Sequence, residues 1–97
     1  MDLPHARALP LTGADQAVRS GPAIYCGFAV QETGGSNSAT VRIYDNASAA
    51  SGTLIDTVNL AAGGSDARMY NRGLWCENGI YLDLGGTGVV AGSIRIG

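Results

Sequence analysis

The residues with the greatest capacity for chemistry are the single histidine and the two cysteines of the chain. A Ser–His hydrolase holds its histidine rigidly beside the nucleophile, and a position as close to a chain terminus as His5 does not favour such rigidity. Cys26 and Cys76 lie fifty positions apart and, together with His5, lack the close ligand pairs of a zinc site, such as Cys-x-x-Cys. We therefore expect neither a catalytic histidine nor a metal site.

The acidic residues offer carboxyl groups for general acid–base chemistry or for calcium, but they are dispersed. They include Asp45, Asp56, Asp66, Glu77 and Asp83. A glycosidase requires two carboxyl groups that face one cleft, and nothing in this spacing demands such a pair. Asp45 and Asn46 could bind calcium in a turn, although hydrogen bonds that cap the turn explain them more simply. The sequence thus predicts a protein that is not an enzyme and holds no cofactor.

Tyr70, Arg72 and Trp75 lie close together in the sequence and permit two interpretations. If they are exposed, they form an adhesive patch for a sugar or a protein, because aromatic residues and arginine dominate the binding energy of interfaces. If Trp75 is buried, it is the main large side chain of a core that is otherwise rich in glycine and alanine. Burial is the favoured interpretation, and the three residues remain candidate interface residues.

The composition limits the partners that the chain can have. Its net charge is −2, and its six basic residues are all arginines spread along the sequence, whereas nucleic-acid-binding proteins cluster their basic residues. The sequence has no apolar run of about 20 residues to span a membrane, and its start lacks the pattern of a secretory signal. We expect no nucleic acid and no membrane partner. Reduced thiols are favoured over a Cys26–Cys76 disulfide.

Residues 1–20 show no sustained periodicity and are predicted to form an extended arm. Their prolines disfavour helix for each preceding residue. Three leucines are unexpected in a purely solvated segment and are candidate interface residues: Leu3, Leu9 and Leu11. The arm either packs along its own domain or lies on a neighbouring subunit. In the second case, deletion of residues 1–18 would leave a folded domain that no longer assembles.

The elements that must position all these residues are short β-strands. After a turn signal at residues 20–22, apolar and polar residues alternate in short runs, with a turn about every eight to twelve residues. The clearest runs are residues 24–30, 39–44, 53–60, 80–84 and 89–96. This spacing is typical of a small antiparallel β-sandwich or barrel. We predict one all-β domain of about six to seven short strands over residues 21–97.

The alternation also predicts which side chains face the core. In the first run these are Ile24, Cys26, Phe28 and Val30. Residues 80–84 and 89–96 are expected to pair as a C-terminal hairpin, which would place Asp83 opposite Arg95 as an exposed ion pair.

Asp56 is the one residue that conflicts with this pattern. In residues 53–60 it has the same parity as Leu54, Val58 and Leu60, so the alternation places a carboxyl group on the apolar side. Either this strand lies at the edge of a sheet, or a bulge shifts its register.

Four phrases of the sequence follow one another in a recognisable order. They are Ser20-Gly21-Pro22 before Tyr25-Cys26-Gly27-Phe28, then Ala39-Thr40-Val41-Arg42-Ile43-Tyr44-Asp45, then Gly52-Thr53-Leu54-Ile55-Asp56-Thr57-Val58, and Asn78-Gly79-Ile80-Tyr81-Leu82-Asp83. This order resembles small β-sandwich virion proteins of tailed bacteriophages, especially head decoration (cement) proteins and head-fibre-like domains. The resemblance covers residues 20–97, and the arm of residues 1–20 departs from it.

The resemblance implies a structural protein that binds and stabilises the outer surface of the expanded phage head. Such proteins often bind as homotrimers at quasi-threefold positions, so the implied partners are the major capsid protein and further copies of the chain. Assembly would take place in the host bacterial cytoplasm, which agrees with reduced cysteines. The family has no catalytic residues to carry over. The alternative is a carbohydrate- or receptor-binding β-sandwich on a tail or head fibre.

Overall fold

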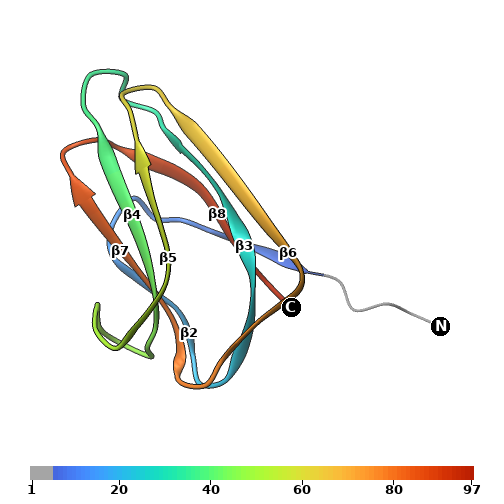
Figure 1. The fold of residues 1–97 in the computed structure, drawn as a ribbon. Coiled ribbons are helices and arrows are strands. Elements are labelled where there is room, and N and C mark those ends of the chain that lie inside the picture. The colour runs from blue at the N-terminus through green and yellow to red at the C-terminus, as the bar shows by residue number, and fades with distance from the viewer. Residues whose placement is uncertain (1–5) are drawn as a thin grey trace.

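The computed structural model describes residues 6–97, which form eight β-strands in two antiparallel sheets of four. The strands are β1 (Arg7–Pro10), β2 (Gln16–Ser20), β3 (Ala23–Glu32), β4 (Ala39–Asp45), β5 (Thr53–Leu60), β6 (Ser65–Cys76), β7 (Gly79–Gly86) and β8 (Val90–Ile96). Sheet 1 has the order β1-β8-β3-β6, and sheet 2 has the order β2-β7-β4-β5. The sheets lie face to face as two layers (Figure 1), so the predicted all-β class is confirmed as a sandwich. It has eight strands, not the predicted six or seven, because β1 and β2 come from the predicted arm.

The connections give this sandwich a specific topology. Consecutive strands alternate between the two sheets everywhere except at β4 and β5, which pair with each other. Eight strands in this order form a jelly roll. As a consequence, all loops but one cross from one layer to the other at the two ends of the molecule.

The core lies between the layers and consists of the inward side chains of both sheets. Its largest fully buried apolar members are Tyr25, Phe28, Ile43, Ile80, Leu82, Ile94 and Ile96. The period-two alternation of β-strands explains this set, because every second residue of β4, β7 and β8 faces the opposite sheet. Each buried side chain of this kind stabilises the fold by about 1.5–3 kcal/mol.

The predicted C-terminal hairpin is wrong, although the alternation within its two strands is confirmed. β7 pairs with β2 and β4, whereas β8 pairs with β1 and β3. The two strands belong to opposite layers because Ile80 and Ile94 must bury their side chains in the same core from opposite sides. Asp83 therefore does not face Arg95, and its carboxylate lies 3.9 Å from Arg42 of the neighbouring strand β4.

A bulge in β3 corrects the predicted core face of that strand. Tyr25 is completely buried, while Ile24 is exposed and Cys26 is only half-buried. The register shifts between Tyr25 and Gly27, so that Tyr25 and Phe28 both point inward although they lie three positions apart. Gly27 has a φ of +128°, and a Cβ at this position would collide with the backbone of β6. The bulge thus depends on glycine.

The described part of the predicted arm forms edge strands of both sheets. β1 pairs with β8 in sheet 1, and β2 pairs with β7 in sheet 2. Leu9 and Leu11 pack partly buried against the core, so they are not available as a docking surface. Residues 6–20 therefore pack along their own domain, which is the first of the two alternatives for the arm. Leu3 and His5 lie outside the described residues.

Deletion of residues 1–18 is therefore expected to destabilise the domain. The deletion removes β1, most of β2 and the contacts of Leu9 and Leu11, which together contribute about 3 kcal/mol or more. Urea denaturation followed by circular dichroism measures the effect, and deletion of residues 1–5, which leaves all eight strands intact, is the control. An unchanged urea midpoint after deletion of residues 1–18 would show that these edge strands do not stabilise the sandwich.

Candidate functional site

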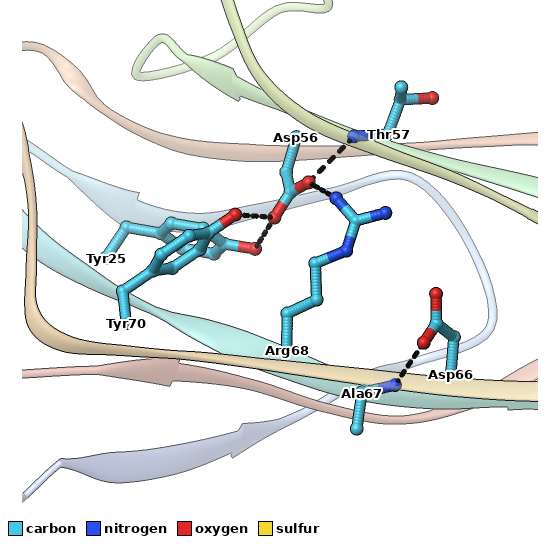
Figure 2. A network of polar contacts seen from close by, with 7 residues as sticks. All are labelled: Tyr25, Asp56, Thr57, Asp66, Ala67, Arg68 and Tyr70. Atoms are coloured by element: carbon cyan, nitrogen blue, oxygen red, sulfur yellow. Dashed lines mark hydrogen bonds and ion pairs between the residues drawn. The ribbon is translucent and has the colours of Figure 1, made fainter.

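Asp56 on β5 is the centre of a buried polar cluster between the sheets. Its side chain is only 3% exposed, and its Oδ2 accepts hydrogen bonds from the hydroxyls of Tyr25, at 3.1 Å, and Tyr70, at 2.9 Å. Its Oδ1 is paired with the guanidinium of Arg68 and accepts the N–H of Thr57 at 3.2 Å. Figure 2 shows the two tyrosine rings side by side with both hydroxyls directed at one carboxylate oxygen.

The cluster joins the two sheets on the side where their edge strands β5 and β6 lie. Burial, reinforced by the nearby carboxylate, raises the pKa of the hydroxyls of Tyr25 and Tyr70, so both remain donors. The charge of Asp56 raises the pKa of Arg68, which keeps its positive charge. Among residues 6–97, no buried polar side-chain atom lacks a hydrogen-bond partner. We conclude that the buried polar groups of this cluster satisfy one another and link the two sheets.

Both explanations offered for Asp56 from the sequence apply. β5 is an edge strand, and its register against β4 shifts so that Ile55 is an extra residue between the pairs Ile43–Asp56 and Tyr44–Leu54. The parity of Asp56 with Val58 and Leu60 was the signal that it faces inward. The sequence alone did not identify its partners, because they come from strands of the other sheet.

Glu32 holds together three loops at one end of the sandwich. It has no exposed surface, and its carboxylate accepts four backbone N–H groups, from Gly34 at 2.8 Å, Gly35 at 2.7 Å, Gly63 at 3.0 Å and Val89 at 2.8 Å. These bonds, led by that of Gly63, lower the pKa of Glu32 to about 2. The loops β3–β4, β5–β6 and β7–β8 are thereby fixed to one anion.

Asp45 performs a similar task at the other end. Its two carboxylate oxygens accept the backbone N–H groups of Glu77, at 3.1 Å, Asn78, at 2.8 Å, and Gly79, at 3.3 Å. The side chain of Asn46 caps the neighbouring β4–β5 loop through the N–H groups of residues 48 and 49. Turn capping therefore accounts for Asp45 and Asn46. This was the simpler of the two interpretations of the sequence, the other being calcium binding.

The other chemically capable residues of the described chain are not gathered into a metal-binding group. Within residues 6–97, no three His, Cys, Asp or Glu side chains lie close enough to hold a metal ion. Cys26 and Cys76 are both free, and burial raises the pKa of the Cys76 thiol to about 11. This described part of the chain also has no helix long and apolar enough to cross a membrane.

The candidate interface residues Tyr70, Arg72 and Trp75 are separated by the structure. Tyr70 is turned inward, where its hydroxyl binds Asp56. Trp75 is 66% exposed, so its favoured assignment to the core is wrong. Ile24 of β3 and Trp75 of β6 pair with each other on the far side of the β3 bulge. The register shift at this bulge turns both side chains to the outer face of sheet 1. Arg72 is also exposed.

The outer face of sheet 1 carries mostly small side chains at one of its ends. Along β3, β6 and β8 the registers place outward Ala29, Ser65, Ala67, Ala91 and Ser93. Larger side chains gather at the opposite end of this face, where Met69 is 59% exposed and Trp75 stands beside Ile24. Exposed apolar side chains gathered on one face mark a binding surface more often than single scattered ones do.

A hollow of about 240 Å³ lies at this end of sheet 1. It is lined by Ala6, Ile24, Cys26, Met69, Tyr70, Asn71, Arg72 and Gly97. A wide bulge in β6 creates it: Leu74 pairs with Tyr25 and Met69 with Gly27, so residues 70–73 of β6 lie opposite a single residue of β3. Gly73 permits the bulge with a φ of +73°. We call the outer face of sheet 1 with Ile24, Met69, Arg72, Trp75 and this hollow the Trp75 surface.

Comparisons of the chain with family models, with curated proteins and with solved structures found no match. The candidate site is therefore defined by its own geometry, as an exposed indole on the outer face of sheet 1 beside an apolar hollow. The sequence analysis identified Trp75 and Arg72 as candidate interface residues but missed Ile24 and Met69. The bulges that turn these two side chains outward and bring them close together had no clear signal in the sequence.

Replacement of Asp56 by alanine is expected to destabilise the fold by about 3 kcal/mol, because it leaves the buried hydroxyl of Tyr25 and the charge of Arg68 without their partner. Urea denaturation at neutral pH measures the loss. Asp66→Ala is the matched control, since the carboxylate of Asp66 bonds only to the N–H of the next residue, and it should cost less than about 1 kcal/mol. Equal effects of the two substitutions would contradict the assigned role of Asp56.

The lowered pKa of Glu32 predicts that the folded protein loses stability in acid. Its pKa is lowered from 4.5 to about 2 in the folded protein, so its contribution is fully present above about pH 4.5 and is lost as the pH falls toward 2. Glu32→Gln should lower the urea midpoint at pH 7, and its difference from the unmodified protein should shrink between those pH values. Glu77→Gln, in the exposed β6–β7 loop, is the control. A Glu32→Gln deficit that stays constant with pH would refute this assignment.

Proposed function

We propose that the protein is a non-enzymatic virion protein of a tailed bacteriophage, a capsid decoration (cement) protein that binds and stabilises the outer surface of the expanded head. The observation that carries this proposal is the exposure of Trp75, 66% of which is open to solvent. A small domain with a single tryptophan would stabilise itself by burying that side chain. Its exposure on the outer face of a sheet instead favours a protein interface, where tryptophan is among the most effective anchors.

The sequence phrases of residues 20–97 support the same function through their resemblance to head decoration proteins. The jelly-roll topology is compatible with it, since this fold occurs in viral capsid domains as well as in lectins, but a fold alone does not decide a function. The partners in this proposal are the major capsid protein and further copies of the chain, as a homotrimer on the outer capsid surface. Assembly follows in the cytoplasm of the host bacterium.

The shape of the Trp75 surface also favours a large partner. Small outward side chains allow another protein surface to approach one end of the sheet closely, while Trp75 and Met69 project from the other end. Many copies bound to one shell need only a modest interface each, because linked copies bind with avidity.

A carbohydrate-binding module on a tail or head fibre is the second candidate, and one observation favours it. Asn71 and Arg72 line the hollow and offer polar groups near the exposed indole of Trp75, the combination that sugars require. Tyr70 does not contribute its hydroxyl to such a site, because that group binds Asp56.

Co-sedimentation with emptied expanded heads and with unexpanded proheads of the phage tests the proposal. We expect saturable binding to expanded heads only, in a fixed ratio to the shell protein. Trp75→Ala should weaken binding at least about tenfold without unfolding the domain. Leu54→Ala is the matched control, because Leu54 is 46% exposed on the other sheet, and it should change the affinity less than about twofold.

Absence of binding to both kinds of particle would overturn the decoration role. Binding to glycans in a glycan screen, abolished by Trp75→Ala, would then establish the second candidate. Loss of the folded state in Trp75→Ala, measured by circular dichroism, would contradict the placement of this side chain on the surface.

A further inference from the structure

The Trp75 surface carries two arginines beside its apolar hollow. Arg72 lines the hollow, and Nη1 of Arg95 donates a hydrogen bond to the sulfur of Met69, another lining residue, at 3.1 Å. Within residues 6–97 the ion pairs are those of Arg42 with Asp83 and of Arg68 with Asp56. Arg72 and Arg95 therefore have no acidic partner in the described part of the chain.

Of the acidic residues in the described chain, Glu77 lies at this end of sheet 1, in the loop that follows β6, and the others are buried or bonded elsewhere. Glu32 and Asp56 are buried, and the carboxylates of Asp15, Asp45 and Asp66 accept backbone N–H groups. Asp83 faces Arg42 on sheet 2. The guanidinium groups of Arg72 and Arg95 therefore form no ion pair within residues 6–97, although the chain carries a net charge of −2. Two guanidinium groups without an ion-pair partner attract a partner of negative charge.

We infer that the Trp75 surface binds an acidic segment of the shell protein, with an apolar side chain of that segment in the hollow and its carboxylates on Arg72 and Arg95. This inference rests on the proposed function and adds the chemistry of the partner. Guanidinium groups bind carboxylates through paired, charge-assisted hydrogen bonds. At about 240 Å³, the hollow is below the usual size of a site for a whole small molecule and suits one side chain.

Charge complementarity favours an acidic protein segment over a nucleic acid. Binding to a phosphate backbone uses a stripe of basic residues at successive phosphates, whereas Arg72 and Arg95 flank an apolar hollow with exposed Trp75 and Met69 nearby. Tryptophan and arginine side chains are the types most enriched in protein–protein hot spots.

The first test measures binding to expanded heads as the charges are changed. The variant with Arg72→Glu and Arg95→Glu should bind at least about tenfold more weakly than the unmodified protein, which should itself lose about tenfold in affinity between about 50 mM and about 300 mM NaCl. Arg19→Glu, exposed on β2 of the other sheet, is the matched control and should change affinity less than about twofold. Circular dichroism verifies folding, and the corresponding glutamine substitutions replace any variant that unfolds.

A second test is independent of phage heads and uses the single tryptophan of the chain as reporter. A synthetic peptide with one leucine between runs of glutamate should shift the emission of Trp75, and the same peptide with glutamine in place of glutamate should not. The peptide test separates the two proposals. If the protein binds no heads, the decoration role fails, and the response to the acidic peptide still shows whether the Trp75 surface binds an acidic segment.

Three results would overturn the inference. One is that the double arginine variant binds heads as well as the unmodified protein does, while Trp75→Ala does not bind them. That result would leave the decoration role intact. Another is an equal response, or none, to the glutamate and glutamine peptides. The third is a shift of Trp75 emission by duplex DNA but not by the acidic peptide, which would assign the surface to nucleic acid.

Discussion

The buried carboxylate of Asp56 determines which way β6 faces, and the proposed binding surface depends on that orientation. Asp56 holds Tyr70 and Arg68 of β6 toward the interior, and Cys76 at the end of the same strand is completely buried. Between these anchored points the chain has more residues than its partner strand, so residues 70–73 form a bulge. This excess of length forms the hollow and leaves Arg72 and Trp75 directed to solvent.

The ends of the sandwich are fixed by the same physical means, a carboxylate that accepts several backbone N–H groups. Glu32 binds loops from both sheets at one end, and Asp45 binds the β6–β7 turn at the other. A domain with few large apolar side chains gains order in its loops from such charge-assisted bonds. The outer face of sheet 1 is consequently held by the core beneath it and by anchored loops at both ends. A preorganised surface loses less conformational entropy when it binds.

The sequence predicted the parts of the fold that depend on local alternation. The inward faces of β7 and β8 were correct because Ile80, Leu82, Ile94 and Ile96 follow a strict period of two. Pairing between strands was not predictable in this way. The alternation places a side chain on one face of a strand but does not select the neighbouring strand, and a short glycine-rich connection permits either a hairpin or a crossing to the other layer.

The candidate site was only partly predictable, for a related reason. Trp75 and Arg72 attracted attention because of their residue types, but the exposure of Trp75 depends on the β3 bulge at Gly27 and the β6 bulge at Gly73. A bulge reverses the parity of every residue beyond it, and the many glycines of the chain give no indication of which one has this effect. Leu9 and Leu11 were likewise kept as candidate interface residues, because β8, along which their segment lies, is far away in the sequence.

The central claim, that the protein docks through the Trp75 surface, is tested most directly by the solvent access of Trp75 in the bound state. Replacement of the single tryptophan by azatryptophan separates its emission from that of the shell protein, and acrylamide quenching then measures its exposure. The account predicts strong quenching in the free protein, where 66% of the side chain is exposed, and much weaker quenching once expanded heads are saturated. Equal quenching in the free and head-bound protein would contradict the claim and place the docking surface elsewhere on the domain.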